Sequence, residues 1–197
     1  AASGLLPHGR GDAAWLDRLA QRFTCNSGWV SHPATWLVSM DYDTGERIAF
    51  GSPGAPTATL SEALRASWAI PGWSPPVPIG GRRFVDGGAA STASADLVLP
   101  LELDEVIVLA PMASTGRIAG RGAARVERLM LRNWMSAGLD AEIAKLEAAG
   151  TQVIRLDATA EDLAVMGPNF MDGRRRLATL EHSLVTTRAQ LANGVRA

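Results

Sequence analysis

The sequence predicts an α/β protein with a largely parallel sheet. Short segments with strand character alternate with segments of helical periodicity along the chain, which is the order typical of this class. The segment Glu105–Leu109 is a nearly continuous apolar run, as expected of a central parallel strand that is covered on both faces. A long helical segment, from about Ala123 to Ala149, separates it from the next strand, Thr151–Leu156.

In the first half of the chain, Asp12 can cap a helix that runs from Ala13 to Phe23. The apolar segment Trp36–Met40 predicts a second central strand. The turn residues Asp43-Thr44-Gly45 lead from it into a further strand, Arg47–Phe50.

Short-range signals mark the elements that follow. Thr59 and Glu62 have the spacing of a capping box, which predicts a helix from there to about Ala69. Gly80-Gly81 can take the positive φ angles of a two-residue turn, so we expect a hairpin with arms Pro76–Ile79 and Arg82–Val85.

Three signals organise the rest of the chain. Gly150 can end the long helix, Thr159 can cap a short one, and a last helix is expected from about Gly173 to Ala192. No internal repeat or low-complexity linker interrupts the sequence, so we expect residues 1–197 to form a single domain.

Composition excludes several classes of protein. The chain is 47% apolar and 20% charged, the balance of a soluble globular protein. A net charge of -1 provides no overall field that would attract nucleic acid. Cys25 is the single cysteine, and the three histidines are scattered, so neither an internal disulfide nor a metal site is expected.

Targeting signals are also absent. No apolar run approaches the roughly 20 residues that span a bilayer, and no signal peptide is present, so we expect a cytoplasmic location. A stripe of basic side chains shares one helical face, and we expect it to be a solvated face; peripheral contact with the anionic head groups of a membrane is the alternative. These side chains are Arg121, Arg125, Arg128 and Arg132.

The stretch most informative about chemistry ends in Asp86-Gly87-Gly88. An aspartate at the end of a strand, followed by two glycines, presents a carboxylate that backbone can approach without interference from a Cβ. Such a carboxylate suits a base that must reach a nucleophile carried on another element.

The residues around this motif resemble the patatin-like phospholipases. The resemblance rests on Ala66-Ser67-Trp68-Ala69-Ile70-Pro71-Gly72 and on Gly80-Gly81-Arg82-Arg83-Phe84-Val85-Asp86-Gly87-Gly88, and it covers about residues 34 to 112. It implies a three-layer α/β/α domain that hydrolyses acyl esters of lipids with a Ser-Asp dyad and without a cofactor. Asp86 is then the dyad aspartate.

The serine of that family lies in a Gly-x-Ser-x-Gly motif, which this sequence does not contain. The chain begins at Ala1 without an initiator methionine, so we expect it to be the carboxy-terminal part of a longer domain whose amino-terminal half carries the serine. An incomplete sheet leaves an unpaired edge, so we also expect self-association.

Two tryptophans near the motif are candidates for substrate binding, Trp68 and Trp73. Both can line an acyl pocket, but the interpretation favoured by their residue type is that both are anchors of the core. For the chain as a whole the alternative to an enzyme is a non-catalytic fragment that binds lipid or another protein. The missing serine motif favours that alternative, while Asp86-Gly87-Gly88 favours the enzyme.

Overall fold

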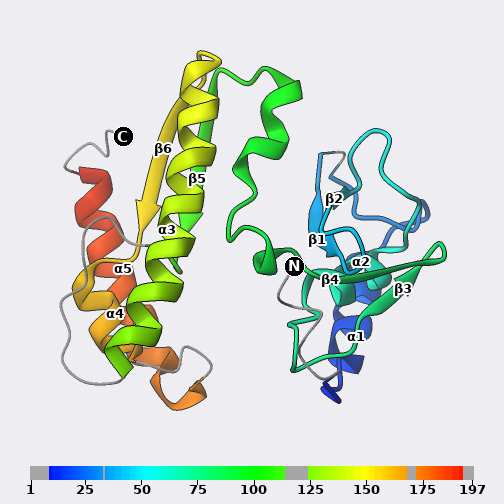
Figure 1. Cartoon of the computed structure of the whole chain (residues 1–197), viewed down its shortest axis with the longest axis horizontal. Helices are drawn as coiled ribbons and strands as arrows, with labels where there is room; N and C mark the ends of the chain where they lie inside the picture. Colours follow the sequence, from blue (N-terminus) through cyan, green and yellow to red (C-terminus); the bar gives the residue numbers. More distant parts are fainter. Residues whose placement is uncertain (1–8, 33, 114–123, 168–171, 193–197) are drawn as a thin grey trace. The chain divides into compact units, whose positions relative to one another are not determined.

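The computed structural model describes residues 9–32, 34–113, 124–167 and 172–192. The chain divides into two compact units, Ala1–Ser91 and Thr92–Ala197, whose elements are labelled in Figure 1. Helices and strands are mixed in both units, which confirms the α/β class. That the two units form a single domain stays a prediction, and each unit is described by itself.

The first unit contains a four-stranded sheet. Its strands are β1 (Leu37–Asp41), β2 (Arg47–Phe50), β3 (Val77–Ile79) and β4 (Arg82–Asp86), in the order β2-β1-β4-β3. As predicted, β1 is a central strand. All three pairings are antiparallel, so the prediction of a largely parallel sheet is wrong here. The reason is the short connections from β1 to β2 and from β3 to β4, which can join only antiparallel strands.

Local residues account for both hairpins. Gly80 and Gly81 have φ angles of 56° and 80°, the positive pair that the tight turn between β3 and β4 requires. Between β1 and β2, the buried Asp41 accepts hydrogen bonds at its Oδ1 from the N–H of Thr44 at 2.8 Å and that of Asp43 at 2.9 Å. Arg82 Nε donates to the other carboxylate oxygen of Asp41 at 2.7 Å.

Two helices complete the first unit: α1 (Ala14–Phe23) and α2 (Leu60–Ser67). The predicted capping box of α2 is present, with Thr59 and Glu62 bonded to each other's backbone N–H. Helix α2 packs on β1, β3 and β4, and α1 packs on α2. The core beneath α2 includes Phe50 and Phe84, whose rings meet edge to face at 5.0 Å.

The second unit contains a parallel pair, β5 (Glu105–Ala110) and β6 (Gln152–Asp157), with α3 (Ala124–Ala148) between them in sequence. Val108 and Val153 pack with residues of α3 in one core. The alternate residues Ile107 and Leu109 are exposed, so the prediction that this strand is covered on both faces is wrong. Among the described strands β5 pairs with β6 alone, and α3 covers one face.

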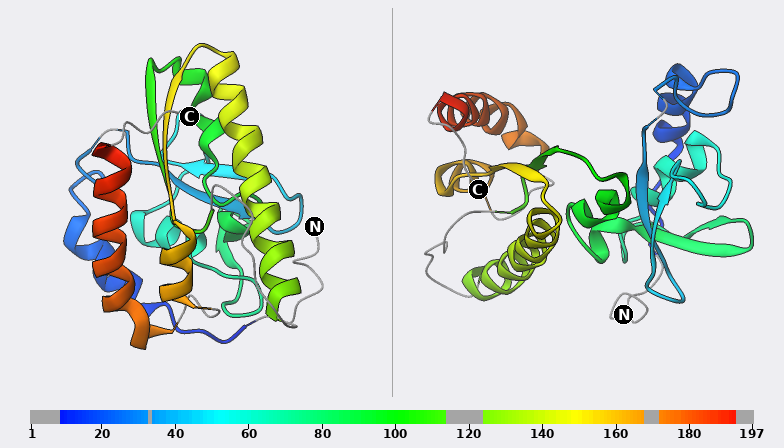
Figure 2. Two further views of the ribbon diagram at one scale, coloured as in Figure 1. Left: turned by 90° about the vertical axis from the view of Figure 1, so that its left-hand side faces the viewer. Right: turned by 90° about the horizontal axis from the view of Figure 1, so that it is seen from above.

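Two further helices belong to this unit, α4 (Ala160–Met166) and α5 (Arg176–Ala192). In Figure 2 α3 runs along one side of the β5–β6 sheet, and α4 follows the end of β6. Helix α5 packs on α4. Within the described residues no helix is long and apolar enough to cross a membrane. The side chains of the predicted basic stripe, from Arg121 to Arg132, lie outside the described part of the chain.

Candidate active site

Asp86 is the last residue of β4, and both its backbone N–H and its carboxylate form hydrogen bonds with backbone groups. Its backbone N–H donates to the carbonyl oxygen of Ala69 at 3.0 Å, which ties the end of the strand to the segment after α2. Its Oδ1 accepts a hydrogen bond from the N–H of Gly88 at 2.8 Å, at the start of the short 3₁₀ turn Gly87–Ala89. The carboxylate is therefore oriented by backbone groups, and among the described residues its second oxygen receives no hydrogen bond.

Both glycines after Asp86 are required by close neighbours. A Cβ on Gly87 would lie 2.7 Å from the carbonyl oxygen of Val38 in β1, closer than atoms of a side chain and backbone approach. A Cβ on Gly88 would lie 3.1 Å from Oδ1 of Asp86 and would press on the carboxylate. The first glycine lets the turn pack on β1, and the second lets the aspartate keep its position.

Ser39 lies directly across the sheet from Asp86, a relationship that the sequence did not reveal. The two residues are register partners in the β1–β4 pairing. The N–H of Tyr42 donates to the carbonyl oxygen of Arg83 at 2.8 Å, so Tyr42 and Arg83 form a hydrogen-bonded pair. Hydrogen-bonded and non-hydrogen-bonded pairs alternate along an antiparallel ladder. Ser39 and Asp86, which lie three positions further along, therefore form a non-hydrogen-bonded pair. Side chains of such pairs share a face and are the closer of the two kinds.

Ser39 is buried and Asp86 is half-buried. Ser39 is 0% exposed, and its hydroxyl has no hydrogen-bond partner among the described residues. Burial raises the pKa of the Asp86 carboxyl above its ordinary value, and the N–H of Gly88 offsets only part of that rise. A carboxylate in such a setting is a stronger base than one in water.

The two candidate substrate-binding tryptophans have different surroundings. Trp68 is the residue at the carboxy-terminal cap of α2, and its ring packs edge to face on Trp15 of α1 at 5.5 Å. Trp73 is exposed, and its carbonyl oxygen accepts a hydrogen bond from the N–H of Gly11 at 2.8 Å. The first unit therefore pairs Trp68 with another tryptophan and leaves the ring of Trp73 facing solvent.

Two hollows lie on the first unit near α1 and α2. The smaller, of about 210 Å³, is lined by Arg65, Ala69 and Ser74 among others. The larger, of about 460 Å³, is lined by Asp17, Thr59 and Ser61 among others. Asp86 lines neither hollow, but Ala69, which accepts its backbone hydrogen bond, lines the smaller one.

The described residues contain no group of three or more histidine, cysteine, aspartate or glutamate side chains that could hold a metal ion. The sequence contains no Gly-x-Ser-x-Gly. The nearest approach, Gly72-Trp73-Ser74-Pro75-Pro76, has proline in place of the last glycine. The candidate site therefore consists of the Asp86 carboxylate and of the glycines and backbone groups that hold it.

Comparison with protein families matches residues 8–99 to the family described as patatin-like phospholipase. The matched segment includes β1 to β4, both tryptophans and Asp86-Gly87-Gly88. No curated protein matched the chain.

Proposed function

We propose that this chain, whose residues 8–99 belong to the patatin-like phospholipase family, supplies the aspartate base of a Ser-Asp dyad in a lipid acyl hydrolase. The observation that carries the proposal is the setting of Asp86: a carboxylate at a strand end, held by the N–H of Gly88, with a pKa raised by burial. The serine is carried by a segment outside residues 1–197.

The chemistry begins with proton transfer. Asp86 accepts the proton of the serine hydroxyl as the serine oxygen attacks the ester carbonyl, which gives a tetrahedral intermediate. The intermediate collapses to an acyl-enzyme as the C–O bond to the alcohol breaks, and Asp86 returns the proton to the departing alcohol oxygen. Backbone N–H groups of the serine segment stabilise the oxyanion. Water then attacks the acyl-enzyme while Asp86 accepts one of its protons, and Asp86 returns that proton to the serine oxygen as the fatty acid leaves. A carboxylate with an ordinary pKa near 4 is a poor base for an alcohol, so burial of Asp86 supports this role.

The two glycines serve the same step. A serine on another element must approach within hydrogen-bond reach of the carboxylate. Side chains at positions 87 and 88 would occupy the space next to Oδ1 and would lift the turn away from β1. The surfaces near Trp68 and Trp73 are proposed to contact the acyl chain, because exposed aromatic rings provide apolar area.

The test is Asp86→Asn in the protein that carries both halves of the dyad, assayed on a p-nitrophenyl ester and on phospholipid vesicles. Removal of a general base typically lowers kcat by about 10²–10⁴-fold. The matched control is Asp43→Asn, the same substitution at an exposed aspartate of the first unit that is paired with Arg83. We expect the control to retain activity within about threefold of the parent, because exposed ion pairs contribute little.

A non-catalytic role is the second candidate, and the absence of Gly-x-Ser-x-Gly from residues 1–197 favours it. A fluorophosphonate probe separates the two. In the hydrolase, residues 1–197 alone stay unlabelled and the protein with the serine segment is labelled. A protein that stays unlabelled with both segments present, and that still binds lipid vesicles, is the non-catalytic form.

A further inference from the structure

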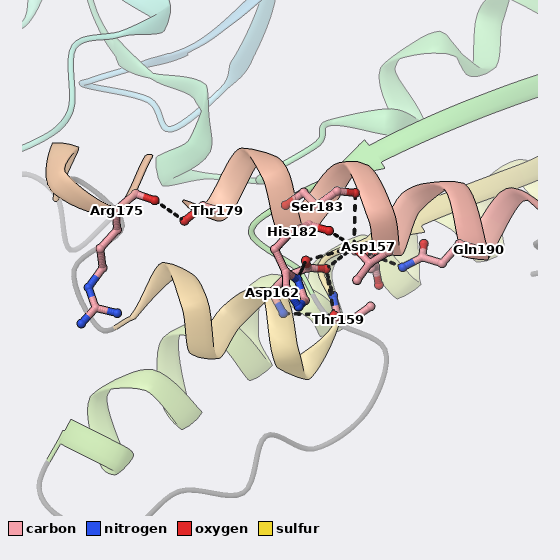
Figure 3. A network of polar contacts seen from close by, with 9 residues as sticks. Asp157, Thr159, Asp162, Arg175, Thr179, His182, Ser183 and Gln190 are labelled. Atoms are coloured by element: carbon pink, nitrogen blue, oxygen red, sulfur yellow. Dashed lines mark hydrogen bonds and ion pairs between the residues drawn. The ribbon is translucent and has the colours of Figure 1, made fainter. Parts of the chain in front are cut away.

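Helix α5 contacts the rest of the second unit with its polar side. His182, Thr186 and Gln190 follow one another at four-residue spacing and therefore share a face. The ring Nδ1 of His182 bonds to Oδ1 of the buried Asp162 at 2.6 Å, and the Thr186 hydroxyl donates to Oδ2 of the same carboxylate at 2.9 Å. Gln190 donates to the carbonyl oxygen of Asp157 at 3.0 Å. Figure 3 shows the contacts of His182 and Gln190 with α4 and the end of β6.

The opposite side of α5 is apolar and faces solvent. Four leucines lie there: Leu177, Leu180, Leu184 and Leu191, exposed by 63%, 56%, 49% and 56%. A surface helix of a globular protein normally turns such a stripe towards its own core. Their spacing of three, four and seven residues is that of the a and d positions of a heptad, a narrow seam suited to one other helix.

Two charged residues beside the leucines, Glu181 and Arg188, are placed so that two copies of α5 can form ion pairs with each other. Glu181 and Arg188 lie seven residues apart on the same flank of the stripe, at the positions that follow d in the heptad. When two copies of α5 pack antiparallel about a two-fold axis near Leu184 and Val185, the order of residues is reversed in the second copy. Glu181 then lies opposite Arg188 of the second copy, and the same pair forms again on the other side of the axis.

We propose that a second copy of this chain covers the stripe, with the two α5 helices antiparallel and their leucines interdigitated. This interface is independent of the chemistry of Asp86. A membrane surface is a poorer fit, since helices that lie on membranes carry a strongly basic polar face, whereas the polar face of α5 is already bonded to α4 and β6. The flank of the stripe carries one charge of each sign, which matches a copy of itself.

The first measurement is sedimentation velocity of the full chain over a concentration series, for which we expect a monomer–dimer equilibrium. Leu184→Glu places two carboxylates next to each other at the two-fold axis, and we expect the dimer to weaken by about 100-fold or more. The matched control is Leu103→Glu, at an exposed leucine outside α5, which should leave the equilibrium unchanged.

Charge exchange tests the antiparallel arrangement itself. Glu181→Arg and Arg188→Glu each bring like charges together in both pairs, and each should weaken the homodimer by about tenfold. An equimolar mixture of the two variants restores opposite charges in both pairs, and it should associate about as well as the parent. A parent chain that stays monomeric at all concentrations overturns the proposal, and so does a mixture of the folded variants that shows no recovery.

Discussion

Ser39 of β1 faces Asp86 of β4 across an antiparallel, non-hydrogen-bonded pair, on the side of the sheet that α2 covers. The serine is fully buried and its hydroxyl has no hydrogen-bond partner within the part of the chain that the structure describes, while the aspartate has a pKa raised by burial. The Ser39 hydroxyl and the partly desolvated carboxylate of Asp86 thus belong to neighbouring side chains on one face of the sheet. Such a pair costs folding free energy, and under the proposed mechanism its carboxylate is the group that accepts a proton.

The first prediction concerns Ser39. Because its hydroxyl is buried and forms no hydrogen bond to any described residue, Ser39→Ala should raise the free energy of unfolding by about 1 kcal/mol. The matched control is Ser61→Ala: the Ser61 hydroxyl donates to Asp17 Oδ1, so its loss should lower the free energy of unfolding. Urea denaturation measures both. A loss of stability in Ser39→Ala would mean that this hydroxyl has a partner in solution, and Asp86 is the neighbour that could accept its proton.

The second prediction separates the two glycines of the motif. Gly87→Ala brings a Cβ against the Val38 carbonyl and should cost about 1–3 kcal/mol of stability, the usual range for overpacking. Gly88→Ala brings a Cβ against Oδ1 of Asp86, so it should lower kcat more than it lowers stability. Thermal melts and ester hydrolysis distinguish these outcomes.

The control for the glycines is Gly138→Ala in α3, where a Cβ would meet nothing within 4 Å. In a helix this substitution should raise stability by about 0.5–1 kcal/mol, from helix propensity alone. Equal losses of activity in Gly87→Ala and Gly88→Ala, with no difference in their melts, would contradict the separate roles assigned to the two residues.

The third prediction is that Asp86→Asn does not destabilise the protein at neutral pH. The pKa of Asp86 is raised in the folded chain, so its charged form is disfavoured there. This penalty is absent below the unfolded pKa of about 3.9 and grows as the pH rises through the folded pKa. Melting temperatures of the parent and of Asp86→Asn should therefore agree in acid, and the variant should melt at an equal or higher temperature at neutral pH. The prediction is contradicted if Asp86→Asn melts at the same temperature as the parent in acid but at a lower temperature than the parent at neutral pH.

Asp41 should behave in the opposite way, which provides the fourth prediction. Burial by itself raises the pKa of Asp41, but the N–H of Thr44, the guanidinium of Arg82 and the N–H of Asp43 together hold it below its ordinary value. Its stabilising effect is present above the unfolded pKa and is lost as the pH falls through the folded pKa. Asp41→Asn should therefore cost about 1–3 kcal/mol at pH 7, and the difference from the parent should shrink in acid. A difference that does not change with pH would contradict the assignment.

The fifth prediction distinguishes the two tryptophans. Trp68→Ala removes the edge-to-face contact with Trp15 and should lower stability, with about 0.5–1.5 kcal/mol from the aromatic pair alone. Trp73 has an exposed ring, so Trp73→Ala should leave the melt nearly unchanged and, if the ring contacts the acyl chain, should raise KM for long-chain esters. KM and kcat for esters of increasing chain length provide the measurement.

Short-range features of this protein were predictable from the sequence because neighbouring residues produce them. The capping box of Thr59 and Glu62, the positive φ angles of Gly80 and Gly81, and the strand that ends at Asp86 all appear as expected. The parallel prediction held for β5 and β6, which a helix connects. It failed for β1 to β4, since an apolar run indicates burial but not the direction of the strand beside it.

The sequence by itself determined the identity of the base candidate and the glycines next to it, because that motif is contiguous and its geometry is local. Only the tertiary structure decided what faces the base. Alternation along β1 places Ser39 on one side of a sheet, but its register with Asp86 depends on how two distant segments pair. The same holds for α5, because a stripe of leucines on a surface helix normally faces the core. The bonds of His182 and Thr186 to Asp162 turn the polar face inwards, because a buried carboxylate must be paired.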